Sequence, residues 1–237
     1  MKKIVGIIGG MGPLATVDLM NKIISYTPAK KDQDHIHIIV DNYSQIPDRT
    51  TAILGIGTDP TPYIIQSAQR LEKAGADFLV MACNTAHFYF KSIKESVSIP
   101  ILHMPLETAR FLHVNDMRSV GLLATDGTIT TKLYQHICQS YDINVIEPDM
   151  QMQKVVMEGI YAIKGSDIEK GRLYLSRVAD KLIKRGAEAI IAGCTEIPLV
   201  LKSYQDICII DPTEILAKSA IKLATETEST KVIGSIS

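Results

Sequence analysis

The sequence has no tryptophan, few cysteines and no long apolar run. Its four cysteines, spread from Cys83 to Cys208 in 237 residues, are too few and too widely spaced for the disulfide framework of a small secreted domain. No apolar run approaches the roughly 20 residues that cross a bilayer. The short apolar stretch after Met1 also lacks the cleavage site of a signal peptide. We therefore expect a cytoplasmic protein without a membrane segment.

An excess of charge of one sign is also missing. The 25 Lys and Arg residues oppose 26 Asp and Glu residues, which gives a formal net charge of −1. Such a balance leaves no basic surface of the kind that binds nucleic acid. No C-x-x-C or C-x-x-H pair is present, so we expect no metal site. With 46% hydrophobic and 22% charged residues, the chain has the composition of a globular protein with a substantial core.

Short β-branched runs alternate along the chain with longer amphipathic stretches. The expected strands are residues 4–8, 35–41, 78–82, 100–103, 120–124, 143–146, 189–192 and 207–210. Helical periodicity is found in residues 63–74, 128–139, 167–185 and 213–225. This alternation predicts an α/β fold in which helices cover mainly parallel sheets on both faces.

One segment of the first half recurs in the second. Residues 72–83 read EKAGADFLVMAC, and residues 183–194 read IKRGAEAIIAGC. In both copies a helix is expected to end at a glycine, a strand follows, and a cysteine lies eight positions after the glycine. The repeat predicts two similar α/β domains with four strands each. We expect the first domain at residues 1–104 and the second at 105–211, with a last helix at about 212–225 packing back on the first domain.

The repeated cysteines, Cys83 and Cys194, come at the ends of strands. Ligands of open α/β sheets bind beyond the carboxyl ends of the strands, and a helix that starts there lowers the pKa of a nearby thiol. Two domains facing each other would place the two thiols on opposite sides of one ligand. A lone cysteine is more often a small core residue. That is the role we expect for Cys138 and Cys208, since no polar turn follows either.

Four motifs resemble those of the aspartate racemases, in the aspartate/glutamate racemase superfamily. They are GGMGP at 9–13, PDRT at 47–50, ACNTAH at 82–87 and GCTE at 193–196, and the resemblance extends from Lys3 to about Ala224. It implies two domains related by pseudo-two-fold symmetry with the active site between them, no cofactor and a homodimer. It also implies that one cysteine from each domain acts as acid or base, the positions held here by Cys83 and Cys194.

Racemisation removes the α-proton from one face of the substrate and returns a proton to the other, which suits two thiols on opposite faces. Charge that develops on the α-carboxylate must meet preorganised donors. The candidate donors follow the ends of strands: Asn84, Thr85, Thr125, Thr128 and Thr195.

An acidic substrate carries a second carboxylate, which requires a cation. Arg49 of the PDRT motif is the candidate, because a guanidinium binds a carboxylate through two hydrogen bonds. The resemblance adds Lys164, which would reach the same carboxylate from the other domain. It also places Met11 and Ala86, in two of the matching motifs, among the substrate-binding residues.

Two departures from the glutamate racemases favour aspartate as substrate. Those enzymes carry an Asp-Ser pair where this chain has Gly9-Gly10-Met11, and a His where it has Glu196. Glutamate remains open as a second substrate.

Three other functions fit parts of the sequence. Residues 10–15, GMGPLA, match the outline of a dinucleotide-binding loop, although an NAD-dependent oxidoreductase leaves the paired cysteines unexplained. Two lobes around a cleft also describe an amino-acid sensor, which would bind aspartate without inverting it. A maleate-type isomerase on the same scaffold would form an adduct at Cys83.

Overall fold

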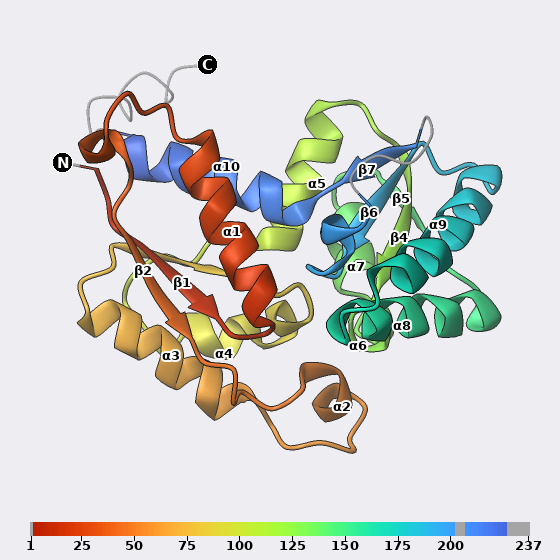
Figure 1. The fold of residues 1–237 in the computed structure, drawn as a ribbon, viewed down its shortest axis with the longest axis horizontal. Coiled ribbons are helices and arrows are strands. Elements are labelled where there is room, and N and C mark those ends of the chain that lie inside the picture. The colour runs from red at the N-terminus through yellow and green to blue at the C-terminus, as the bar shows by residue number, and fades with distance from the viewer. Residues whose placement is uncertain (1, 202–206, 227–237) are drawn as a thin grey trace.

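The computed structural model describes residues 2–201 and 207–226, and each half of the chain forms a parallel sheet covered by helices (Figure 1). The first sheet contains β1 (Val5–Gly9), β2 (Ile38–Asn42) and β3 (Phe78–Met81) in the order β2-β1-β3. In its parallel register Gly6 pairs with Ile39 on one side and with Leu79 on the other. The predicted α/β class is therefore confirmed for this half.

The second sheet repeats this arrangement with one more strand. It contains β4 (Ser119–Ala124), β5 (Asn144–Ile146), β6 (Ala189–Gly193) and β7 (Cys208–Ile210) in the order β5-β4-β6-β7, all parallel. The central strands β1 and β6 are buried along their whole length, which explains their continuous apolar sequences.

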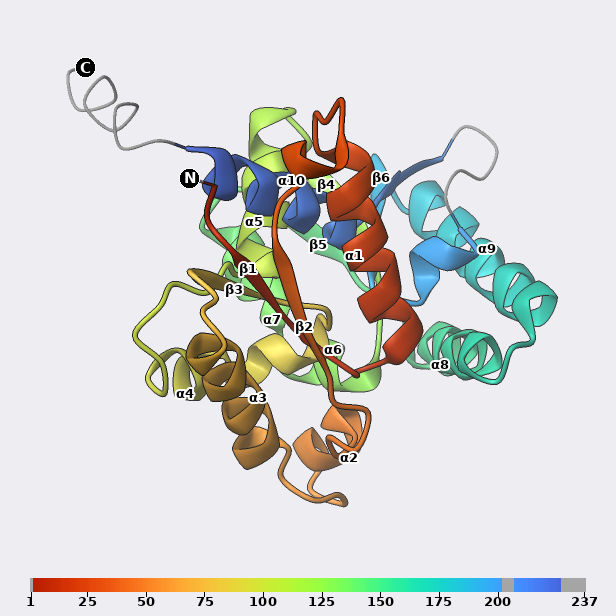
Figure 2. The same cartoon turned by 60° about the vertical axis from the view of Figure 1, so that its left-hand side comes forward.

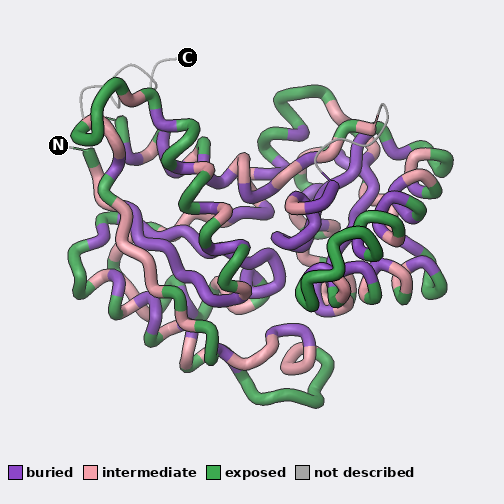
Figure 3. Tube along the Cα trace, viewed as in Figure 1, coloured by how far each residue is buried: buried purple, intermediate pink, exposed green. Residues whose placement is uncertain are grey.

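The helices lie on both faces of each sheet. With the first sheet lie α1 (Pro13–Tyr26), α2 (Arg49–Ile53), α3 (Thr61–Lys73), α4 (Phe90–Lys94) and, from the end of the described chain, α10 (Pro212–Thr225), with the 3₁₀ turns η1 (Asp32–Asp34) and η2 (Thr85–Tyr89). With the second sheet lie α5 (Met104–Val114), α6 (Asp126–Thr130), α7 (Leu133–Gln139), α8 (Met150–Lys164), α9 (Ile168–Lys184) and η3 (Ile197–Leu199). Each sheet separates two hydrophobic clusters, and buried residues follow the strands in both halves (Figure 3).

Three sequence predictions were wrong in detail. Residues 100–103 form only an isolated bridge, Leu79 with Ile101, because His103 already caps α5 by accepting a hydrogen bond from Leu106. The first sheet therefore has three strands, not four. The predicted strand at 35–41 starts only at Ile38, after the turn η1. The helix expected at 128–139 is divided into α6 and α7 by Lys132, whose φ of 53° is left-handed.

The last described helix, α10, packs against α1 and α5, between the two halves (Figures 1 and 2). Its residues Leu216, Ala217 and Ala220 belong to the core around β1. Lys22 of α1 bonds Asp211, at the start of α10, at 2.5 Å. These contacts support the domain division that we propose, residues 1–104 with α10 and residues 105–211. A chain ending at Asp211 should accordingly show a lowered melting temperature by circular dichroism.

Candidate active site

The two repeated cysteines border one narrow cavity between the halves of the molecule. Cys83 lies two residues after β3 and Cys194 directly after β6, and each is only 6% exposed. The residues lining the cavity are Met11, Asp48, Arg49, Thr50, Cys83, Asn84, Thr85, Thr125, Lys164, Cys194, Thr195 and Glu196. Its free volume is about 20 Å³, room for little more than one water molecule. The cavity must therefore widen before an amino acid can bind.

Most of the predicted site residues come together here, and two do not line the cavity. Ala86 is buried in the core on one face of the first sheet, and Thr128 lies behind the lining threonines. Asp48, Thr50 and Glu196 also line the cavity, although the sequence did not predict them as site residues. The motifs could have identified them, because all three residues lie inside PDRT or GCTE.

The thiol of Cys194 donates a hydrogen bond to a carboxylate. Its Sγ atom lies 2.9 Å from Oε2 of Glu196, and both residues are buried. Burial, together with the negative charge of Glu196, raises the pKa of Cys194 well above its ordinary value, and the nearby Lys164 acts in the opposite direction. The protonated thiol is therefore the favoured state of Cys194 in this arrangement.

Cys83 is held through its backbone. The buried His87 contacts the carbonyl oxygen of Cys83 through Nδ1 at 2.8 Å, and its Nε2 accepts a hydrogen bond from the amide of Met104 at 3.1 Å. Because Nε2 accepts, Nδ1 carries the hydrogen and donates it to Cys83. Burial, with a contribution from the neighbouring His103, lowers the pKa of His87 to about 3. A neutral imidazole thus ties the Cys83 loop to the start of α5.

The segments after the two cysteines differ. The turn η2 after Cys83 continues directly into α4, whereas only the three-residue turn η3 follows Cys194. A helix dipole therefore has little structural basis for lowering the pKa of Cys194, since the dipole of so short a segment is small.

Arg49 is a buried cation without a carboxylate partner in the part of the chain that the structure describes. Asp48 caps α2 and places Arg49 as its first residue, 8% exposed. The guanidinium donates to three carbonyl oxygens, those of Ile46 at 3.3 Å, Pro47 at 3.0 Å and Met11 at 3.3 Å. Its Nε has no partner among the described residues. A buried positive charge with donor capacity left over suits an anionic ligand.

A second cation reaches the cavity from the other half. Lys164 is the last residue of α8. Burial lowers the pKa of its ammonium, but the negative charges that Cys194, Glu196 and Cys83 can carry outweigh this effect, so that the pKa is raised. Lys164 therefore stays positive and lies where it can stabilise a thiolate or a substrate carboxylate.

Three threonine hydroxyls join the two halves beside the thiols. Oγ1 of Thr85 lies 2.8 Å from that of Thr125 and 3.0 Å from that of Thr128, and the last two are 3.2 Å apart. Gly127 allows this approach, because a Cβ atom there would come within 3.1 Å of Thr50 and Thr85.

The glycines of the GGMGP motif serve close packing. A Cβ atom on Gly10, whose φ is +86°, would lie 2.3 Å from the backbone of Tyr43, and one on Gly9 would lie 2.4 Å from Thr16. Gly10 also donates its amide hydrogen to the hydroxyl of Thr16 at 2.9 Å. These contacts favour a structural role for the loop over the dinucleotide-binding one.

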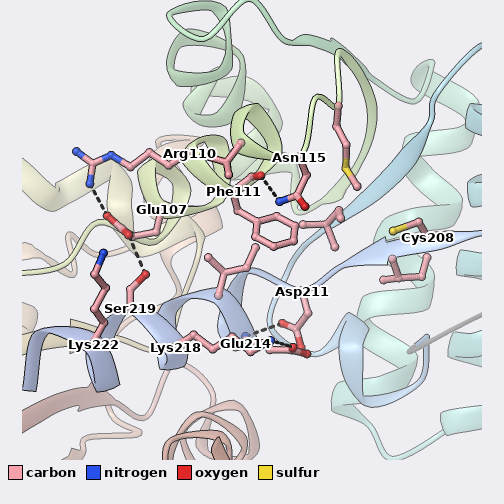
Figure 4. Close-up of a pocket in the computed structure, with 15 residues that line it drawn as sticks. Glu107, Arg110, Phe111, Asn115, Cys208, Asp211, Glu214, Lys218, Ser219 and Lys222 are labelled. Carbon is pink, nitrogen blue, oxygen red and sulfur yellow. Dashed lines mark hydrogen bonds and ion pairs between the residues drawn. The ribbon is translucent and has the colours of Figure 1, made fainter. Parts of the chain in front are cut away.

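A larger pocket of about 550 Å³ lies elsewhere, between α5, β7 and α10 (Figure 4). Cys208 borders it together with Phe111 and Glu214, and none of the predicted site residues does. The expectation that Cys208 is a core residue was wrong, because it opens the edge strand β7 and is exposed. Cys138 is buried in α7 as expected, and burial raises its pKa to about 12.

Within residues 2–201 and 207–226, no three His, Cys, Asp or Glu side chains are grouped as a metal site requires. In the same described part of the chain, no helix combines the length and apolarity needed to span a membrane.

Comparison with known proteins agrees with the site. Residues 8–220 match the family model described as Asp/Glu/Hydantoin racemase. A broad specificity amino-acid racemase of Bacillus subtilis is 34% identical over 92% of this chain and 96% of its own length. The structure of Picrophilus torridus aspartate racemase is 36% identical, covers 95% of both chains and superimposes with a TM-score of 0.87. An aspartate racemase homologue from Pyrococcus horikoshii is 25% identical over 95% of this chain, with a TM-score of 0.76. The chain therefore belongs to the Asp/Glu/hydantoin racemase family, and these relatives support an amino-acid racemase activity.

Proposed function

We propose that the protein interconverts L- and D-aspartate without a cofactor, using Cys83 and Cys194 as its two acid–base groups. The observation that carries the proposal is that one thiol from each half borders the same closed cavity. A single base would have to move to the other face of the substrate, whereas two opposed thiols need not.

In the proposed reaction the thiolate of Cys83 takes the α-proton of one enantiomer, and the thiol of Cys194 gives its proton to the opposite face of the α-carbon. The raised pKa of Cys194 supports its starting role as proton donor. After one turnover Cys83 is the thiol and Cys194 the thiolate, ready for the other enantiomer. The charge of Lys164 then offsets the repulsion between the Cys194 thiolate and Glu196.

The developing carbanion needs hydrogen-bond donors at the α-carboxylate, because no cofactor withdraws its charge in this scheme. We assign this role to Asn84, Thr85, Thr125 and Thr195, which line the cavity next to the thiols. Thr128 supports them through its hydroxyl contacts with Thr85 and Thr125. Met11, which lines the cavity, would contact the substrate, whereas Ala86 lies in the core and receives no such role.

Arg49 is assigned to the side-chain carboxylate, with Lys164 approaching from the other half. The aspartate racemase relative supports aspartate as substrate. The broad specificity relative favours a second candidate, a racemase that accepts glutamate and further amino acids as well.

The test is incubation of EDTA-treated protein, without pyridoxal phosphate, with L-aspartate, L-glutamate, L-alanine and maleate separately. Chiral chromatography should detect D-aspartate, with less or no product from the other amino acids. Activity that requires an added metal or pyridoxal phosphate would contradict the proposal. Binding of aspartate without inversion would indicate a sensor, and conversion of maleate to fumarate would indicate the isomerase.

A homodimer, which rests on the family resemblance, and the cytoplasmic location expected from the sequence complete the proposal. Size-exclusion chromatography with light scattering tests the first, and cell fractionation tests the second.

A further inference from the structure

We propose that Tyr134 is a positioning residue that turns the carboxamide of Asn84 so that its NH₂ group faces the substrate carboxylate. The inference rests on the proposed function. Tyr134 lies on α7 in the second half and is fully buried, while Asn84 follows Cys83 in the first half and is 1% exposed. The hydroxyl of Tyr134 donates a hydrogen bond to Oδ1 of Asn84 at 2.5 Å.

This bond fixes which end of the carboxamide is available. With Oδ1 bonded to Tyr134, the two N–H groups of Nδ2 point away from that contact. Nδ2 is buried and has no hydrogen-bond partner among the described residues. Leaving a buried donor unpaired costs about 1–3 kcal/mol. Because Asn84 lines the cavity next to Cys83, the unpaired group is a preorganised donor for a carboxylate oxygen.

The hydroxyl of Tyr134 keeps the hydrogen that it donates to Oδ1 of Asn84. Burial raises the pKa of Tyr134 well above its ordinary value, so the phenol remains protonated. If the carboxamide were turned over, Oδ1 would face the substrate carboxylate and repel it.

Tyr134 does not line the cavity and belongs to none of the four motifs, so its effect must pass through Asn84. The bond also crosses from one half of the molecule to the other. It therefore makes the orientation of this donor depend on how the two halves meet.

The test is a double-mutant cycle of Tyr134→Phe and Asn84→Ala, followed through kcat/KM for both enantiomers of aspartate. Tyr134→Phe keeps the ring and removes only the hydroxyl, and we expect roughly a tenfold loss, as for one hydrogen bond. In the Asn84→Ala background the same change should alter kcat/KM by less than about twofold, since the group it orients is gone. A purely structural role would give the same loss in both backgrounds.

Tyr141→Phe is the matched control, because among the described residues its hydroxyl bonds the exposed Arg110 alone, at 3.4 Å, and the variant should keep the wild-type rate. Asn84→Asp provides a second variant if Tyr134→Phe does not fold. It can still accept from Tyr134 but has no N–H group and adds a negative charge, so it should lose at least as much activity as Asn84→Ala.

The outcomes separate this inference from the proposed function. If the wild-type protein does not racemise aspartate, the proposed function fails. If it does, wild-type activity in Tyr134→Phe or in Asn84→Asp overturns the role of Tyr134, as does full additivity in the cycle.

Discussion

The thiol of Cys194 lies 2.9 Å from a carboxylate oxygen of Glu196, whereas the corresponding position after Cys83 is occupied by Thr85. The two cysteines hold equivalent positions in the sequence repeat, but the charge of the side chain two residues further on differs. A carboxylate raises the pKa of one thiol, while a hydroxyl that bonds Thr125 and Thr128 follows the other. Under the proposed mechanism this difference determines which thiol carries the proton before substrate binds.

Glu196→Gln should lower the pKa of Cys194, because it removes the negative charge that disfavours the thiolate. The measurement is alkylation of Cys194 by iodoacetamide as a function of pH, read by peptide mass spectrometry in a Cys83→Ser background. The midpoint should move to lower pH in the variant. An unchanged midpoint, or a shift to higher pH, would mean that the carboxylate does not control this thiol.

Arg49→Lys should weaken aspartate turnover, because it keeps the charge but loses the planar pair of donors. We expect a loss of about 2–3 kcal/mol in transition-state stabilisation, obtained from kcat/KM. The loss should be smaller for any activity on alanine, which lacks the second carboxylate. The exposed Arg118→Lys serves as the control. Equal losses on aspartate and alanine would place the side-chain carboxylate elsewhere.

Acid should destabilise the protein through His87. Its pKa is about 3 in the folded state against an ordinary 6.5, so the stabilisation is complete above pH 6.5 and is lost as the pH falls towards 3. Between pH 6.5 and pH 5 this residue alone should remove about 2 kcal/mol from the free energy of unfolding. Urea unfolding at several pH values measures the effect. His87→Gln should have a shallower acid dependence, and an identical slope would contradict this assignment.

The sequence predicted those parts of the site that follow from residues close to one another in the chain. The glycine-to-cysteine repeat predicted that Cys83 and Cys194 follow strands, and parallel strands ending at one edge bring them to one cavity. The PDRT motif predicted an arginine at the site, and the structure adds that Asp48 caps the helix that Arg49 begins.

Most of what the sequence did not predict depends on contacts between distant segments. Tyr134 reaches Asn84 from fifty residues away, and no spacing rule relates the two. Glu196 was noted as a departure from the glutamate racemases, but only the direction of its side chain makes it a partner of Cys194. The prediction of a strand at residues 100–103 was wrong for a local reason, because His103 caps the helix that follows. The prediction that Cys208 is a core residue was wrong because its exposure depends on β7 being an edge strand.

The most direct test of the two-thiol mechanism follows α-deuterium incorporation in deuterated water for Cys83→Ser and Cys194→Ser, each with L- and D-aspartate. Neither variant should racemise aspartate, because a serine hydroxyl is a far weaker base than a thiolate. Each should exchange the α-proton of one enantiomer without inverting it, with opposite preferences in the two variants, while the exposed Cys208→Ser keeps full activity. Racemisation at the wild-type rate by either Cys83→Ser or Cys194→Ser would contradict the mechanism.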